Sequence, residues 1–191
     1  MRRLSPLVLL TVLAACAGYE TFQPPPLDYG DRAPLRFAVQ SVAVESAYHS
    51  SGAPPYVENS LPLAPEAAVR ALLEQRLKAA GGAGRLEAEI VDASVQEEKL
   101  ATESGLEGML TTEPASRFTG RIRVRVDRLD DRGNAIRSVT TAALRSRTVP
   151  EGAGFADRQR IGYELVRDLV DDFDAALVDN LEQGFADIIL P

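Results

Sequence analysis

The residue types that most often carry catalysis are scarce in this sequence. Its single histidine, His49, lies in the segment Tyr48-His49-Ser50-Ser51. A hydrolase could use this histidine as a base for a neighbouring serine, but a catalytic triad is defined by three-dimensional geometry, and adjacent side chains rarely point productively at one another. The nucleophile pattern Gly-x-Ser-x-Gly does not occur. We therefore predict a protein that is not an enzyme and has no catalytic residue.

Metal ligands are equally sparse, because with one histidine and one cysteine only carboxylate and amide groups remain. Asp127, Asp130, Asp131 and Asn134 are similar in composition to a calcium loop, but they lack the EF-hand spacing and its closing glutamate. Turn chemistry explains these residues. Glu97-Glu98 and Asp171-Asp172 are expected to be solvated charges, and half of a carboxylate pair is the alternative. We expect neither a metal nor a cofactor.

The distribution of arginine is the most informative charge pattern. Residues 117–147 contain nine arginines and three acids, whereas residues 151–191 contain ten acids and three arginines. An arginine-lined strand face would suit phosphate or carboxylate groups of a lipid, a lipopolysaccharide or a partner protein. The favoured alternative is that Glu87, Glu89 and the C-terminal acids neutralise these arginines. The predicted face consists of Arg121, Arg123, Arg125, Arg137, Arg145 and Arg147.

The N-terminal residues have the layout of a secretory signal. Arg2 and Arg3 form a positive end, residues 7–13 an apolar centre, and small residues follow. The apolar run is less than half of the roughly 20 residues that a spanning helix needs. Leu13-Ala14-Ala15-Cys16 resembles the lipobox of bacterial lipoproteins, with an ordinary cleaved signal as the alternative. The resemblance implies that residues 1–15 are removed and that Cys16 is acylated.

The same resemblance implies where the protein is attached. A lipoprotein cysteine carries a diacylglyceryl group and an amide-linked acyl chain such as palmitate, and stable anchoring requires more than one chain. Ala17 follows Cys16, in place of the aspartate that marks inner-membrane retention in many Gram-negative lipoproteins. We therefore expect a protein anchored in the outer membrane by lipid and facing the periplasm.

Composition limits the remaining classes of function. Residues 1–15 hold two arginines and no acid, so their removal changes the net charge from −7 to −9. An acidic balance disfavours nucleic-acid binding, which depends on lysine and arginine contacts to phosphate. Residues 16–34 are rich in proline and turn formers and are expected to be a tether. Residues 35–191 are long enough for a single domain with one core.

Hydrophobic periodicity places the elements of that domain. Residues 35–45 and 85–100 read as strands, each with a change of phase that predicts a bulge. A helix is expected from Pro65 to the Gly81-Gly82 pair, and residues 117–129 and 135–149 form strands joined by a turn with Gly133 at positive φ. A final helix carries an apolar stripe from Ile161 to Ile188, with its firm part between Gly162 and Gly184.

These elements predict an α+β fold in the order β-α-β-β-β-α. An antiparallel sheet of about four strands, with both helices packed on one face, buries all the apolar stripes. The polar residues of the strands would then occupy the other face of the sheet.

Four segments carry a family likeness: 55–59 with Pro62 and Pro65, 75–79, 92–95 and 146–152. In these segments the mature chain resembles a family of small lipoproteins of Gram-negative bacteria to which no activity is assigned. In element order it is also similar to the auxiliary lipoproteins of lipid-trafficking ABC systems and to the lipopolysaccharide-assembly lipoprotein. We therefore predict a non-enzymatic protein-interaction component of an envelope transport or assembly system. The alternative is an anionic-lipid or lipopolysaccharide-binding module that uses the arginine-lined strand face.

Overall fold

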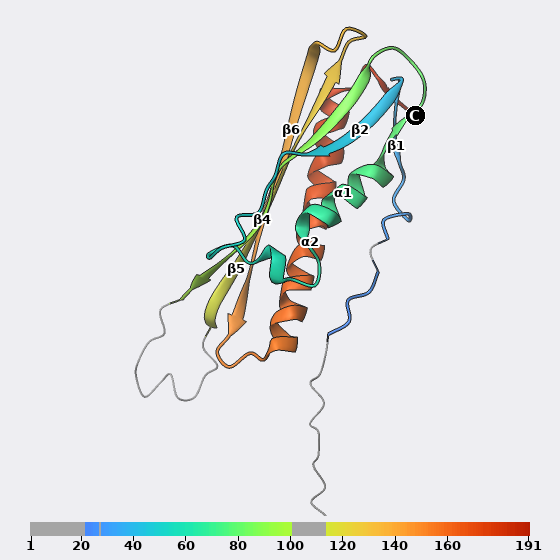
Figure 1. The fold of residues 1–191 in the computed structure, drawn as a ribbon. Coiled ribbons are helices and arrows are strands. Elements are labelled where there is room, and N and C mark those ends of the chain that lie inside the picture. Colours follow the sequence, from blue (N-terminus) through green and yellow to red (C-terminus); the bar gives the residue numbers. More distant parts are fainter. Residues whose placement is uncertain (1–21, 27, 101–113) are drawn as a thin grey trace, which may run out of the picture.

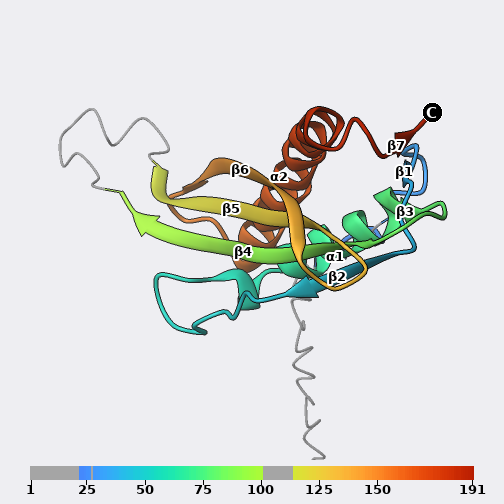
Figure 2. The same ribbon diagram turned by 90° about the horizontal axis from the view of Figure 1, so that it is seen from above.

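The computed structural model describes residues 22–26, 28–100 and 114–191. The predicted signal peptide and Cys16 lie outside these residues. A four-stranded sheet forms one layer and the helices α1 and α2 form the other, so the α+β class is confirmed (Figures 1 and 2). The core lies between the two layers, where the large buried side chains come from both helices and from one face of the sheet.

The main sheet has the strand order β2-β4-β5-β6. Its strands are β2 (Ser41–Ser46), β4 (Arg85–Lys99), β5 (Pro114–Leu129) and β6 (Ala135–Pro150). The pairs β4–β5 and β5–β6 are antiparallel as predicted, but β2 runs parallel to β4. The reason is that α1 lies between β2 and β4 in the chain, and a helical crossover returns the chain to run in the same direction.

The first predicted strand is in fact two strands in different sheets. Residues 38–40 separate β1 (Leu35–Phe37) from β2, and β1 pairs with β3 (Leu77–Ala79) and β7 (Ile189–Leu190) in a small second sheet. The Val39 N–H donates to Phe37 O at 2.8 Å, and this tight turn breaks the strand. The phase change in the sequence therefore marks a change of sheet and not a bulge.

Helix α1 (Pro65–Arg76) begins at the predicted proline but ends before the glycine pair. Leu77, predicted as part of the helix, pairs instead with Leu35 in the parallel β1–β3 ladder. Backbone pairing with β1 thus overrides the helical periodicity of these residues. A 3₁₀ turn, η1 (Glu58–Ser60), precedes α1.

Helix α2 (Phe155–Gly184) crosses the inner face of the sheet and contacts β5 and β6. It starts before Gly162, so the expectation that this glycine lies in a weak end was wrong. Gly162 is buried beside Leu61, whose Cδ2 would lie 2.5 Å from an added Cβ atom. Tertiary packing therefore explains the glycine, and the helix continues through it.

The predicted bulge in β4 is confirmed. The register with β5 shifts between Ile90 and Asp92, and the extra residue is Val91. The shift keeps Leu86, Ala88, Ile90, Ala93 and Val95 on the buried face. One inserted residue thus reconciles two phases of alternation with one core.

The segment predicted as a tether contacts the domain at its C-terminal part. Tyr29 is buried and its N–H donates to Gln75 Oε1 at 3.1 Å, while the Phe22 ring lies 5.5 Å from the Tyr163 ring. Arg32 forms ion pairs with Asp171 and Asp174 of α2. The chain is therefore held against the helix layer before it reaches β1.

Candidate functional site

The strand register divides the six arginines of the predicted face between the two faces of the sheet. Arg145 pairs with Gly120, and Arg147 pairs with Phe118, both of which belong to the buried face of β5. Arg137 faces the same side, where its guanidinium donates to Gly184 O at 2.7 Å. Only Arg121, Arg123 and Arg125 are on the outer face. The single arginine-lined face is thus a wrong expectation, because the β5–β6 register sets the two groups in opposite phase.

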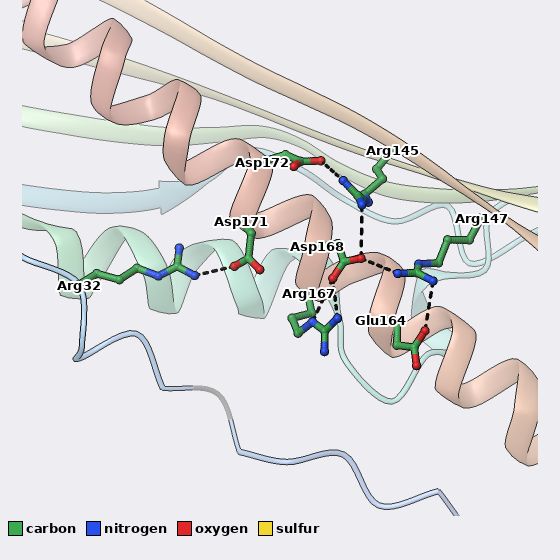
Figure 3. Close-up of polar contacts among 8 residues, drawn as sticks. All are labelled: Arg32, Arg145, Arg147, Glu164, Arg167, Asp168, Asp171 and Asp172. Atoms are coloured by element: carbon green, nitrogen blue, oxygen red, sulfur yellow. Dashed lines mark hydrogen bonds and ion pairs between the residues drawn. The ribbon is translucent and has the colours of Figure 1, made fainter.

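Two of the arginines on the helix side, Arg145 and Arg147, are neutralised by acids of α2 (Figure 3), and Arg137 lies 3.8 Å from Asp187. Arg145 lies 2.5 Å from Asp172 Oδ2 and 3.5 Å from Asp168, and Arg147 lies 3.2 Å from Glu164. Arg147 also binds Asp168. The expected neutralisation by C-terminal acids is found here, and these arginines attach β6 to α2.

Asp168 is the centre of this cluster. Burial favours its neutral form, but hydrogen bonds from Arg167 and Arg147 outweigh burial and lower the pKa of the Asp168 carboxyl. The bond to Asp172 raises the pKa of Arg145. These acids and arginines pair with one another, so the cluster offers little to an external ligand.

The outer arginines differ from one another in their partners. Arg125 lies 2.8 Å from Glu89 and 3.0 Å from Asp127, so one of the predicted neutralising acids does act here. Among the described residues, Arg121 and Arg123 have no carboxylate within the 4.0 Å of an ion pair. These two guanidinium groups are the best candidates for binding an external anion.

Arg121 and Arg123 line a cavity of about 360 Å³ on the outer face of the sheet. The cavity is also lined by the loop of residues 47–57, which contributes His49 and Tyr56 and forms the loop wall of the cavity, and by Asp92 of β4. A second hollow of about 290 Å³ shares both arginines and extends to Leu144 of β6. We define the first hollow, with its two arginines, as the outer cavity.

Glu58 holds the loop wall of the outer cavity in place. Its side chain is buried and accepts hydrogen bonds from Tyr48 Oη at 2.6 Å, from the Ser50 hydroxyl and from Val95 N at 3.3 Å. Burial disfavours the charge, but the bonds from Ser50 and Tyr48 prevail and lower the pKa of Glu58. Burial and the bond to Glu58 raise the pKa of Tyr48. The ionised carboxylate thus fixes the loop.

The other candidates of the sequence have structural partners. Ser50 donates to Glu58 and the Ser51 hydroxyl donates to Ala53 O at 3.2 Å, so neither hydroxyl is directed at His49. Glu97 binds Arg158, and Asp171 and Asp172 bind Arg32 and Arg145, so these acids are paired and not merely solvated.

Asp130 and Asn134, which are among the residues similar in composition to a calcium loop, close the predicted hairpin turn. Asp130 Oδ1 accepts from Arg132 N at 2.9 Å and from Asn134 N at 2.8 Å, and Gly133 has φ of 86° as predicted. The hydrogen bonds from Asn134 lower the pKa of Asp130. Across the described residues, no group of three or more His, Cys, Asp or Glu side chains is placed to hold a metal ion.

Two functional features were missed by reasoning from the sequence. Glu58 carries no pattern that separates it from a surface acid, and its burial depends on β4 lying beside the loop. Asp92 and Tyr56 are brought to Arg123 by the β4–β5 register and by a bridge between Tyr56 and Gln96. Two signals were available: the bulge prediction in β4, which sets which residues face outward after Val91, and the family likeness, whose segments 55–59 and 92–95 contain Tyr56, Glu58 and Asp92.

Comparisons with known proteins give structural neighbours only. No protein-family model matches the chain, and a search of curated proteins gives no match. A minor lipoprotein from Acinetobacter baumannii is similar at 14% identity and a TM-score of 0.39, covering 80% of this chain and 96% of its own. The rare lipoprotein B from Shewanella oneidensis is similar at 11% identity and a TM-score of 0.40, covering 73% and 92%.

A putative lipoprotein from Caulobacter crescentus CB15 is similar at 17% identity and a TM-score of 0.28, covering 74% of this chain and 91% of its own. The solved structures that this chain resembles therefore include lipoproteins of Gram-negative bacteria, as the sequence resemblance implied. At these identities and TM-scores they assign no function. Within the part of the chain that the structure describes, none of the helices combines the length and apolar character of a bilayer span.

Proposed function

We propose that this protein is a lipoprotein anchored in the outer membrane through Cys16, where it faces the periplasm. In this proposal it is a non-enzymatic component of an envelope transport or assembly system and works by binding a protein partner. The signal layout and lipobox of residues 1–16 support the anchor. The surface that would meet the partner is the outer face of the main sheet.

The observation that carries this proposal is the character of β6 on that face. Within the described residues, β6 pairs only with β5 and so forms an edge of the sheet. Natural proteins commonly protect long edge strands with charged side chains. The charged residues of β6 instead point to α2, and Ile136 and Leu144 are 58% and 59% exposed. The outward positions of β6 are all uncharged: Ile136, Ser138, Thr140, Ala142, Leu144, Ser146 and Thr148.

An uncharged edge strand of this length suits a protein surface better than a dissolved ion. A partner can add a strand to the free edge or pack apolar side chains against Leu144, and both modes bury uncharged surface at little desolvation cost. The surface of the helix layer differs from this uncharged strand, because the acidic side chains on the outer side of α2 are exposed or paired with arginines.

Photo-crosslinking in cells tests this proposal. A photoreactive amino acid at Leu144 should give a discrete protein adduct, whereas the same group at the exposed Asp179 of α2 should not. A lipid adduct at Leu144, or equal protein adducts at both positions, would contradict it.

The outer cavity favours a second candidate function, the binding of an anionic lipid or lipopolysaccharide. Its supporting observation is that Arg121 and Arg123 lack ion pairs in the described part of the chain while most other arginines have them. This pair of arginines is smaller than the set of six arginines that was expected from the sequence. A variant with both Arg121→Ala and Arg123→Ala that folds and fully complements a deletion strain would exclude this candidate.

The anchor is tested separately by mass spectrometry of the native protein. The expected N-terminal residue is Cys16, carrying the mass of a diacylglyceryl group and an acyl chain. Cys16→Ser should leave the protein uncleaved or soluble in the periplasm. A different N-terminus, or no lipid mass, would overturn the localisation.

A further inference from the structure

The outer cavity is formed because β2 ends at Ser46 while β4 continues beside it. The loop of residues 47–57 takes the place of the missing strand, with bonds from Val57 N to Val95 O (2.9 Å) and from Glu97 N to Pro55 O (2.8 Å). These bonds and the buried Glu58 fix the loop wall. At about 360 Å³, the cavity has the size of a small-molecule site.

One side of the cavity is suited to a phosphate or carboxylate group. Arg121 and Arg123 are two residues apart on β5, so their side chains project from the same face. Two guanidinium groups that lack an internal carboxylate partner can bind one oxyanion through several charge-assisted hydrogen bonds.

The other side of the cavity is suited to a positive or hydroxyl-bearing group. Asp92 lines the cavity directly opposite Arg123 in the β4–β5 register, but the two do not form an ion pair. A carboxylate at this position repels a bare polyanion and accepts hydrogen bonds from an ammonium group. The rings of Tyr48 and Tyr56 also line the cavity, and aromatic faces attract cations.

We propose that the outer cavity binds a phosphoethanolamine group, with the phosphate on Arg121 and Arg123 and the ammonium group on Asp92 and the tyrosine rings. This short zwitterion matches the close spacing of opposite charges in the cavity. The Tyr48 hydroxyl is already committed to Glu58, so Tyr48 contributes its ring and Tyr56 retains its hydroxyl for the phosphate or for water.

The inference deepens the second candidate function and rests on it, since both use Arg121 and Arg123. It adds selectivity, because a surface that only attracts anions would not distinguish phosphoethanolamine from glycerol 3-phosphate. Failure of the second candidate would show as loss of binding to both phosphates. Failure of this inference alone would show as binding without a preference between them.

The test is titration of the full-length lipidated protein in detergent with O-phosphoethanolamine and with glycerol 3-phosphate, followed by calorimetry. We expect the protein to prefer O-phosphoethanolamine. Loss of one charge-assisted hydrogen bond costs about tenfold in affinity, so Arg121→Gln with Arg123→Gln should weaken binding by at least about tenfold. Asp92→Asn should remove most of the preference while retaining glycerol 3-phosphate binding.

Arg117→Gln is the matched control, because Arg117 is exposed on β5 and is not part of the cavity lining. It should leave both affinities unchanged. No binding to the wild-type protein at millimolar concentration, or equal binding by the wild type and the double arginine variant, would overturn the proposal. A preference that persists in Asp92→Asn would also overturn it.

The same titration distinguishes the two sources of this group. Short-chain dihexanoylphosphatidylethanolamine carries it on a lipid, and O-phosphoethanolamine carries it free. Tighter binding of the lipid form would assign the cavity to a phospholipid head group. Tighter binding of the free form would assign it to a soluble compound, and either result supports the cavity as the site.

Discussion

Arg76 at the end of α1 donates from Nε to Asp174 Oδ1 in the middle of α2 at 2.9 Å, and both side chains are about 10% exposed. The other carboxylate oxygen of Asp174 binds Arg32 at 2.8 Å. The Arg32 guanidinium also lies 5.0 Å from the centre of the Tyr29 ring. One buried aspartate therefore joins the two helices to the segment that leads toward the N-terminus.

Asp174→Ala should destabilise the protein by about 3–5 kcal/mol, since removing one member of a buried ion pair leaves uncompensated charge. Here it would leave two arginines without their shared partner. Urea unfolding followed by circular dichroism measures the change. Asp172→Ala is the control, because the Asp172 side chain is 48% exposed, and it should cost less than about 1 kcal/mol. Equal losses of unfolding free energy in the two variants would show that Asp174 does not hold the two helices and the N-terminal segment together.

The two groups of arginines should differ in what they contribute to stability. Arg145→Ala with Arg147→Ala should lower the free energy of unfolding by roughly 1–2 kcal/mol, because partly exposed pairs each contribute at most about 1 kcal/mol. This loss should shrink in high salt. Arg121→Ala with Arg123→Ala should change stability by less than about 0.5 kcal/mol. Thermal and urea unfolding of both double variants makes the comparison, and the opposite ranking would contradict the assignment of faces.

Glu58→Gln should destabilise the protein by about 1–3 kcal/mol at pH 7, because the buried carboxylate accepts charged hydrogen bonds. The pKa of Glu58 in the folded protein is below its ordinary value of 4.5. Its ionised form therefore stabilises the fold above pH 4.5, and this contribution is lost as the pH falls through the folded pKa.

The difference in unfolding free energy between wild type and Glu58→Gln should therefore be largest at neutral pH and decrease below about pH 4.5. Urea unfolding between pH 3 and pH 8 measures it. Glu45→Gln is the control, since Glu45 is exposed on β2, and it should show no such trend. A constant difference across the range would mean that the Glu58 charge does not contribute.

Gly120 of β5 lies where α2 approaches the sheet closely, and an added Cβ would be 2.8 Å from Leu169 Cδ2. Gly120→Val should therefore destabilise the protein by about 1–3 kcal/mol through overpacking. Leu169→Ala alone should cost about 2–5 kcal/mol through a cavity. The double variant should cost clearly less than the sum, as measured by a double-mutant cycle. Simple additivity would show that the two residues do not compete for space.

The sequence by itself determined the elements whose signals are local. Alternation on β4 and β5, the Asp130–Asn134 turn, Pro65 at the start of α1 and the apolar stripe of α2 each depend on a few neighbouring residues. The backbone preferences of these residues and the burial of their apolar side chains favour the same element, whichever other segment it packs against. The lipobox belongs to the same class, because an enzyme reads it as a linear motif, and it remains a prediction.

The tertiary structure decided which segments meet. Leu77 leaves its helix to pair with Leu35, and β2 runs parallel to β4, because long-range pairing supplies backbone bonds that outweigh local preference. The arginines divided between two faces because a register is set by both strands and not by either alone. Asp92, Tyr56 and Arg123 meet only once the bulge, the loop and the hairpin are all in place.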